Sequence, residues 1–119
     1  MLTDTVETVL DNGPDPRLTV TVRGPAVGTA GRVVPSGELT RDTGQVFVEA
    51  VRTALRYGYR DVRVDLGEVS FVDARGLAVC LVAVRMAAEE GCALDFENAG
   101  PMLARVLALG GLTARTAGD

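Results

Sequence analysis

The clearest place for chemistry in this chain is at residues 73–76, which read Asp-Ala-Arg-Gly. They follow a strand-like segment at residues 62–66 and precede an apolar segment that begins at Leu77. An Asp before a small residue, with Gly three positions after that Asp, predicts a tight turn and a helix N-terminus at the exit of a strand. Unpaired backbone N–H groups at a helix N-terminus make this turn a favourable place for negative charge.

The composition excludes most catalytic chemistry. The chain has no His, and all 12 of its basic residues are Arg, so it has no Lys either. The ordinary Ser-type and Cys-type catalytic triads and His-ligated metal sites need a His, whereas a P-loop or a Schiff base needs a Lys. Cys80 and Cys92 are too few and too far apart in the sequence for a zinc knuckle. The sequence therefore predicts a protein that is not an enzyme, with no cofactor and no metal site.

The bulk properties predict one folded domain. A chain of 119 residues is long enough for a single core, and 47% of its residues are hydrophobic. The net charge of −4 argues against nucleic acid as the main partner. The longest apolar run, residues 77–84, is far shorter than the ~18 residues of a membrane span, and the polar, acidic start does not resemble a signal peptide. We expect a cytoplasmic protein without membrane insertion.

The first third of the chain predicts two strands that follow a loop. Residues 1–16 end in a segment rich in Gly and Pro, so we expect them to be flexible or weakly structured, with a short strand or a helical turn near Val9 left open, and we expect the domain to span residues 17–119. Alternating apolar and polar residues at 18–23 predict a half-buried strand. A second strand at 32–35 should lie near an edge or end at Pro35, because Pro has no N–H to donate. Residues 24–31 predict a hairpin connection and not a phosphate cradle, because they do not open a helix.

Three helices and three more strands follow in alternation. The first helix should have its cap at Asp42 and end at Gly58, and the second should run over residues 74–91. Strands are predicted on either side of the second helix, at residues 62–66 and 92–97. A third helix should start at Pro101, with Met102, Val106 and Leu109 on one face, before a last short strand at 112–116. The order β-β-α-β-α-β-α-β predicts an α/β domain with a mixed sheet, parallel at its centre, and helices packed against it.

The second helix is expected to be the most buried element. Residues 77–84 are apolar on every side, which is typical of a helix that lies between other elements. Within it, Cys80 is expected to be a buried, reduced thiol. Ser70 precedes Phe71 in a segment whose backbone should also be buried. One core cluster should form between the helices and the sheet from Phe47, Leu55, Leu77, Leu81 and Val84.

The turn at residues 73–76 resembles the signature of the STAS domain in its anti-sigma factor antagonist type. Two further segments are similar to that family: residues 37–39 (Gly-Glu-Leu) before the first helix and residues 110–112 (Gly-Gly-Leu) near the end. The resemblance covers residues 18–115. It implies a STAS-like single domain and a non-catalytic protein-interaction module, an anti-sigma factor antagonist of a bacterial partner-switching system.

The resemblance also implies a partner and a site. The partner would be an anti-sigma factor with a kinase-like fold, bound at the N-terminal end of the second helix and at adjacent loops, and a homodimer is left open. The residues implied in partner binding are Asp73, Ala74, Arg75, Gly76, Ser36 and Glu38.

Ala74 stands at the phosphoacceptor-equivalent position, where the phosphorylatable members of the family have Ser or Thr. Without a hydroxyl group this position cannot accept the phosphate that a partner kinase would transfer. Two interpretations stay open. Ala74 either marks a degenerate site in a protein whose interaction phosphate does not regulate, or it mimics the unphosphorylated, binding-competent state permanently.

Each of the other turn residues has a structural and a functional interpretation. Asp73 can cap the helix, form part of a docking edge, or do both. Gly76 can allow the close approach of a neighbouring loop or of a partner. Arg75 should point outward, either as a solvated charge or as a partner contact.

Two other functions are weighed against the antagonist. One is a STAS scaffold subunit of a stress-signalling or lipid-transport complex, which the fold cannot distinguish from the antagonist. The other is a small nucleotide- or flavin-binding α/β enzyme, for which the chain lacks a glycine loop that opens a helix.

Overall fold

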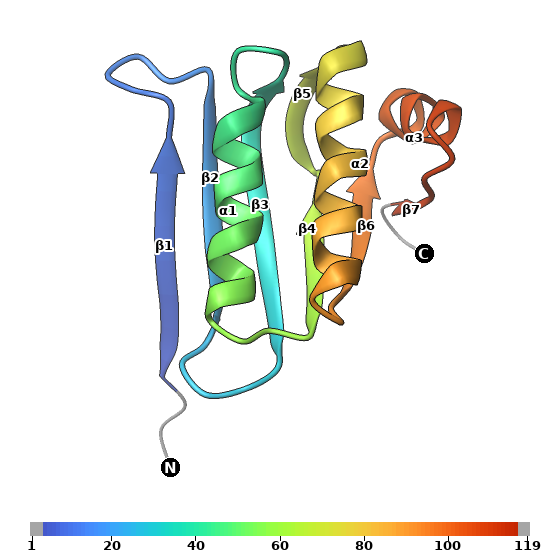
Figure 1. The fold of residues 1–119 in the computed structure, drawn as a ribbon. Helices are drawn as coiled ribbons and strands as arrows, with labels where there is room; N and C mark the ends of the chain where they lie inside the picture. The colour runs from blue at the N-terminus through green and yellow to red at the C-terminus, as the bar shows by residue number, and fades with distance from the viewer. Residues whose placement is uncertain (1–3, 117–119) are drawn as a thin grey trace.

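The computed structural model describes residues 4–116, which form a seven-stranded sheet and three helices (Figure 1). The strands are β1 (Thr5–Asp11), β2 (Leu18–Pro25), β3 (Ala30–Leu39), β4 (Asp61–Asp65), β5 (Glu68–Val72), β6 (Ala93–Ala99) and β7 (Ala114–Thr116). The helices are α1 (Gly44–Arg56), α2 (Ala74–Glu89) and α3 (Pro101–Leu109).

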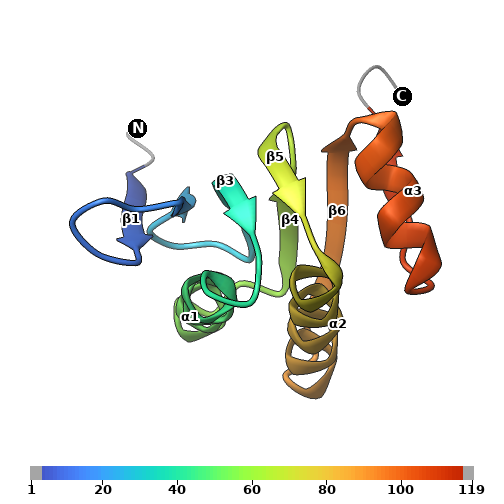
Figure 2. The same ribbon diagram turned by 90° about the horizontal axis from the view of Figure 1, so that it is seen from above.

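The sheet is mixed, as the alternation of strands and helices predicts. Its order is β1-β2-β3-β4-β6-β7, and β5 pairs with β3 beside this path. The β1–β2 and β2–β3 pairs are antiparallel, whereas β3–β4, β3–β5, β4–β6 and β6–β7 are parallel. Seen from above, α1 and α2 lie side by side on one face, and α3 lies beside the β6 end (Figure 2). The structure thus confirms a single α/β domain with a mixed sheet.

Two strands extend the predicted order. The weakly structured segment expected before residue 17 contains β1, which pairs along its whole length with β2, from Thr5 opposite Pro25 to Asp11 opposite Thr19. The short strand that the sequence left open is therefore the one that forms, because β2 offers it a hydrogen-bonding edge. The second addition is β5, which lies between β4 and α2 in the sequence.

Pro35 is neither at an edge nor at the end of its strand. β3 is a central strand of ten residues, and Pro35 is buried within it. Val33 is the last β3 residue opposite β4, and Ser36 is the first opposite β5. Pro35 therefore stands where β3 changes partners on that side, so a missing N–H is tolerated there.

The N-cap of the first helix lies one residue later in the chain than expected. The N-cap is Thr43 and not Asp42, which is exposed. The Thr43 hydroxyl donates to the Glu38 carbonyl oxygen (2.6 Å) and accepts from the Thr40 backbone N–H (2.9 Å), so it holds the β3–α1 turn and makes no cap bond within α1. Gly58, with φ of +88°, lies just beyond the C-cap, as expected of a residue that ends a helix.

The expectation that α2 is buried on every side is wrong. Its buried residues are small and lie three or four positions apart: Gly76, Cys80, Ala83 and Ala87. Leu81 and Val82 are 38% and 45% exposed, so Leu81 does not belong to the core cluster. These small residues form the buried face, and Leu81 and Val82 lie on the outer face of the helix. The other large apolar residues of α2 are partly buried against the core: Leu77, Val79, Val84 and Met86.

The rest of the expected cluster is present in part. Phe47 is fully buried, and Leu55, Leu77 and Val84 pack against the core while they remain partly exposed.

Two further exposures differ from expectation. Ser70 is exposed instead of buried, because β5 has a neighbouring strand, β3, on one side only among the described residues. On α3, Met102 and Leu109 are 74% and 83% exposed, and the helix packs through Leu107. The apolar face predicted for α3 is therefore mostly a solvent-facing one.

The sheet face opposite α1 and α2 carries charged residues. Arg32 and Arg63 lie opposite each other on β3 and β4. The Arg32 guanidinium bonds to Glu97 (2.5 Å) and lies 3.4 Å from Asp65, and a second oxygen of Glu97 lies 3.7 Å from Arg63. These carboxylates offset the repulsion between the two arginines, which would otherwise be unfavourable for like charges that face each other across neighbouring strands.

Candidate functional site

The N-terminus of α2 is built by Asp73. Its carboxylate accepts a hydrogen bond from the Gly76 backbone N–H (2.8 Å), so Asp73 is the N-cap. Its own backbone N–H donates to the carbonyl oxygen of Leu39 at the end of β3 (3.2 Å). The predicted capping role is confirmed, and the cap ties the helix to the sheet.

Gly76 is where the helix and the sheet come closest. A Cβ atom at this position would lie 2.0 Å from the Leu39 carbonyl oxygen, so no residue larger than Gly fits the present backbone. The neighbour that requires this Gly is the end of β3, within the same chain. The close approach predicted for Gly76 is confirmed, and its cause is structural.

Ala74 and Arg75 form the exposed part of this turn. Both side chains are exposed, so the outward position predicted for Arg75 is confirmed. Arg75 makes no ion pair with any described residue. The first turn of α2 has no acidic residue inside the helix, and the Asp73 carboxylate at the N-cap offsets the positive end of the helix dipole.

The predicted β3 residues lie beside β5 at two distances from the turn. Glu38 stands opposite Phe71, next to the Leu39–Val72 pair that leads into the turn. Its carboxylate lies 3.7 Å from the Arg17 guanidinium.

Ser36 lies opposite Glu68 at the other end of β5. It is three residues before Leu39, about 10 Å along the strand. The structure therefore brings Glu38 to the turn and leaves Ser36 farther away, while partner binding by these residues stays a prediction.

An apolar groove next to the turn is the feature that sequence reasoning missed. It has a volume of about 390 Å³ and lies between β5 and the start of α3. Phe71 at its edge is 54% exposed. Its lining residues are Ser70, Phe71, Val72, Gly100, Pro101, Met102, Leu103 and Val106. The sequence predicted Met102 on one face of the third helix and Phe71 in a segment with buried backbone, so neither residue indicated a groove.

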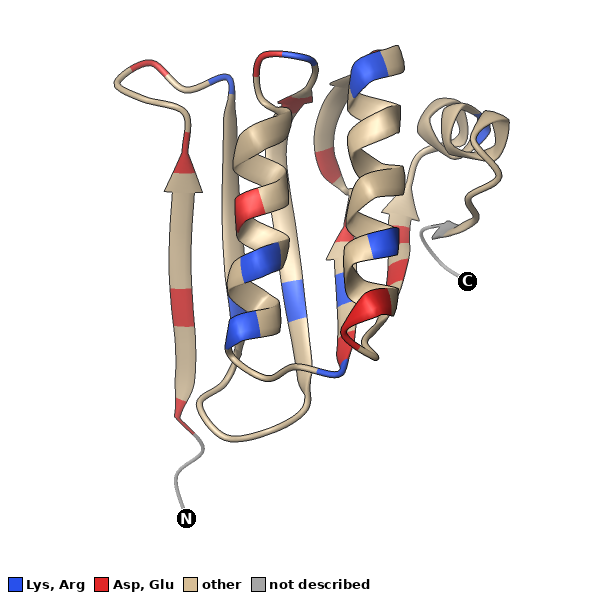
Figure 3. Ribbon diagram, viewed as in Figure 1, with Lys and Arg blue, Asp and Glu red and all other residues tan. Residues whose placement is uncertain are grey.

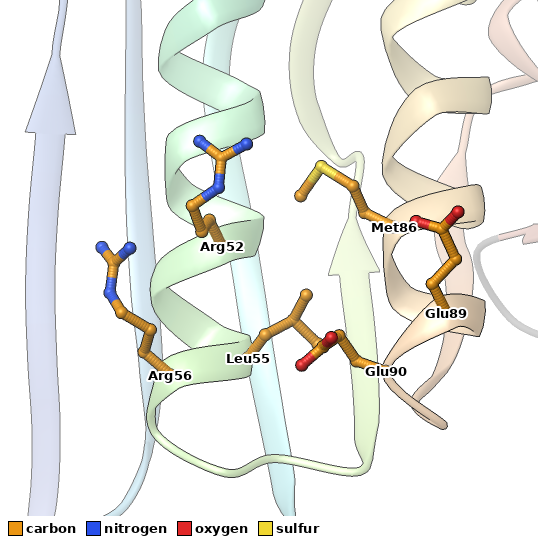
Figure 4. A pocket seen from close by; sticks show the side chains of 6 residues that line it. All are labelled: Arg52, Leu55, Arg56, Met86, Glu89 and Glu90. Carbon is orange, nitrogen blue, oxygen red and sulfur yellow. The ribbon is translucent and has the colours of Figure 1, made fainter.

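A second pocket, of about 370 Å³, lies between α1 and α2 at the other end of α2 (Figure 4). Arg52 and Arg56 line it from α1, and Glu89 and the C-cap residue Glu90 line it from the end of α2. Arg52 is already paired with Glu49. The two walls carry opposite charges, and the pocket is separated from the Asp73 turn by the length of the helix.

The two cysteines are buried free thiols. Burial raises the pKa of Cys80 to about 12, and burial is also the largest cause that raises the pKa of Cys92. A thiol with a raised pKa is a poor nucleophile, which agrees with the predicted structural role of Cys80.

Within residues 4–116, no three or more His, Cys, Asp or Glu side chains are grouped so that they could hold a metal ion. None of the helices in this part of the chain is long and apolar enough to cross a membrane.

Comparisons with known proteins agree with this fold. A family model described as "Mlab, STAS domain" matches residues 23–114. No curated protein matches the chain at the level of sequence.

Solved structures share the fold at low identity. An anti-sigma factor antagonist from Mycobacterium paratuberculosis is 20% identical with a TM-score of 0.70, over 86% of this chain and 88% of that one. The unphosphorylated form of the Bacillus anti-sigma factor antagonist SpoIIAA is 18% identical with a TM-score of 0.63, over 82% and 88% of the two chains. The murine anion transporter Slc26a9 is 15% identical with a TM-score of 0.63, over 92% of this chain and 19% of the transporter.

These solved structures share the arrangement of helices and strands, and the family match extends from β2 to the start of β7. The chain therefore belongs to the STAS domain family.

Proposed function

We propose that this domain is a non-catalytic, cytoplasmic interaction module that acts as an anti-sigma factor antagonist. The observation that carries the proposal is the form of the α2 N-terminus. Asp73 caps the helix and is half-buried, while Ala74 and Arg75 face the solvent. The family match supports this role, as does the likeness to two antagonist structures.

The proposed partner is an anti-sigma factor with a kinase-like fold. Its contact surface on this domain would be the turn from Asp73 to Gly76 together with Glu38 on β3, and Ser36 would contribute from farther along the strand. The turn is held by the Asp73 cap and by its bond to Leu39. The surface is therefore ordered before a partner arrives, which lowers the entropic cost of binding.

The proposed module has no phosphate switch at Ala74. A phosphate would add about −1.5 to −2 charges at the helix N-terminus and would alter any interface built on it. The Ala74 side chain has no oxygen to accept one. Ser70, four residues earlier, has its hydroxyl engaged with the Gly37 carbonyl oxygen (3.2 Å). In this proposal, binding is governed by the amounts of the two proteins and not by modification of the turn.

The test uses the wild-type chain and two serine variants, each incubated with ATP and the cognate partner kinase and then examined by mass spectrometry. Ala74→Ser restores a hydroxyl in the turn, and Ala78→Ser adds one to an exposed position one helical turn later as a matched control. We expect phosphate on Ala74→Ser alone, and weaker partner binding once it is modified.

Phosphate on the wild-type chain would contradict a module without a switch. An unmodified Ala74→Ser variant that still folds would favour a scaffold over an antagonist.

A second function, as a scaffold subunit of a stress-signalling or lipid-transport complex, is favoured by one observation. The outer face of α2 exposes Leu81 and Val82, which lie away from the turn and would be covered in a permanent assembly. Purification of the native protein from its host, followed by light scattering, distinguishes the two functions. A larger multi-subunit particle supports the scaffold, a complex with one anti-sigma factor supports the antagonist, and the same data show whether the domain forms a homodimer.

A further inference from the structure

The groove between β5 and α3 has the shape of a receptor for side chains. Its volume of about 390 Å³ is at the small end of the range of binding pockets, ~300–1,000 Å³, so it has room for one or two large side chains. β5 pairs only with β3 among the described strands, and its other side faces α3. The groove is therefore a consequence of β5 leaving the main path of the sheet.

Two large apolar side chains at this groove are exposed to solvent. Phe71, on β5, is 54% exposed, and Met102, in the first turn of α3, is 74% exposed. Both line the groove, together with the partly buried Leu103 and Val106. Neighbouring exposed apolar side chains mark an interaction surface, because covering them would remove apolar area from water.

Positive charge flanks the groove on both helices. Arg75 lies in the first turn of α2, three positions after the β5 lining residue Val72. Arg105 follows the lining residues Met102 and Pro101 by three and four positions on α3, and residues at these spacings share a helix face. Both arginines are exposed and make no ion pair with any described residue. The first turn of α2 carries a basic residue, and the charge on α3 is basic (Figure 3).

Carboxylates also lie near the turn, but two of them are engaged within the chain. The Asp73 carboxylate accepts the Gly76 N–H and offsets the positive dipole end of α2. The Glu38 carboxylate, on the β3 residue opposite Phe71, lies 3.7 Å from the Arg17 guanidinium. Glu68 is at the start of β5, at the end far from α2. Arg75 and Arg105 therefore remain exposed positive charges without an ion-pair partner among the described residues.

We propose that this groove binds an acidic amphipathic segment of the partner protein. An apolar side chain of that segment enters between Phe71 and Met102, and its carboxylates pair with Arg75 and Arg105. The groove is continuous with the turn that begins at Asp73, so one partner can cover both. This inference rests on the proposed function for the partner being a protein, and it adds the chemistry that the partner must present.

The experiment uses defined peptides, so it does not depend on the identity of the partner. The probe is a short helical peptide with Leu on one face and Glu beside it. It is titrated into the isotope-labelled chain and followed by NMR chemical-shift changes. Comparison peptides replace the Glu residues by Lys or the Leu residues by Ser. We expect shifts at the groove with the Glu–Leu peptide only, and weaker binding as salt is added.

Variants assign the contacts. Met102→Ser should weaken binding of the Glu–Leu peptide about tenfold, because it removes an apolar contact that the bound peptide would bury. Arg75→Gln and Arg105→Gln should each weaken it about two- to fivefold. Leu109→Ser, at an exposed α3 position outside the groove, and Arg85→Gln, ten residues after Arg75 on α2, are matched controls that should leave binding unchanged.

Four results would overturn the proposal. They are no binding of the Glu–Leu peptide, equal binding of the Lys peptide, shifts confined to the α1–α2 pocket, and shifts at the groove that grow with protein concentration in the absence of peptide. The last result would identify a second copy of the chain as the occupant. Failure of this test with a positive kinase assay at Ala74→Ser would leave the antagonist function intact and remove only the groove.

Discussion

Replacing Gly76 by Ala would place a Cβ atom 2.0 Å from the carbonyl oxygen of Leu39. Real Cβ atoms essentially never approach another heavy atom closer than 3.0 Å, so the start of α2 and the end of β3 would have to separate by at least about 1 Å. The oxygen in question belongs to the backbone of a central strand and cannot turn aside as a flexible side chain would.

The cost follows from the contacts that this separation strains. The Asp73 N–H bond to Leu39 contributes about 1 kcal/mol, and the Asp73 cap on Gly76 about another 1 kcal/mol. Overpacking adds about 1–3 kcal/mol, and the better helix propensity of Ala offsets up to about 1 kcal/mol. We expect Gly76→Ala to lower the free energy of unfolding by about 2–4 kcal/mol.

The assay is urea unfolding followed by circular dichroism, with Gly100→Ala as the matched control. Both glycines lie at a helix N-terminus, Gly100 as the N-cap of α3 and Gly76 in the first turn of α2. A Cβ atom at Gly100, however, would meet nothing within 4 Å. The control should lose less than about 1 kcal/mol. A loss below ~1 kcal/mol for Gly76→Ala, or equal losses for both variants, would refute the idea that the contact with Leu39 is what requires Gly at this position.

Three further predictions concern stability and are measured by the same unfolding assay. Because burial raises the pKa of Cys80 to about 12 from 9.0, the folded chain keeps a proton that the unfolded chain loses, so stability falls as pH rises through this window. Between about pH 8 and about pH 10 the wild type should lose about 1 kcal/mol more than Cys80→Ala, and parallel pH profiles would contradict this. Asp73→Ala should cost about 1 kcal/mol through loss of the cap, and an unchanged midpoint would show that the Gly76 bond contributes nothing. Leu81→Ala should cost less than about 1 kcal/mol because the side chain is 38% exposed, whereas the buried Phe47→Ala should cost about 3–5 kcal/mol, and similar costs would mean that α2 is covered in solution.

Local features of the sequence were sufficient for much of the fold. The α1 and α3 helices, the β2–β3 hairpin and the turn at Asp73 were predicted from residues that lie within a few positions of one another. A cap, a helix end such as Gly58 and a strand alternation are local hydrogen-bonding and side-chain patterns, so they are visible without tertiary structure. Even there the N-cap of α1 was placed one residue too early, because Asp42 is also a favourable cap residue, whereas the Thr43 hydroxyl is used in the β3–α1 turn.

Which face of each helix is buried could not be predicted from local sequence patterns. An all-apolar run predicted a fully enclosed α2, yet only its small residues Cys80, Ala83 and Ala87 are buried together with Gly76, and Leu81 is exposed. Whether Leu81 is buried depends on an element from elsewhere in the chain, or from a partner, lying over it. Periodicity reports which residues share a face and not what lies against that face.

The sequence alone determined the chemistry available at the turn: a carboxylate that can cap, a methyl group in place of a hydroxyl at Ala74, and an arginine beside it. Only the tertiary structure decided that the Leu39 carbonyl oxygen lies so close to residue 76 that Gly is required there. It also decided that β5 lies off the main path of the sheet, so that Phe71 and Met102 line a groove next to that turn. The reason is that capping is settled within four residues, whereas the groove needs segments about thirty residues apart to be brought together by parallel pairing through β3, β4 and β6.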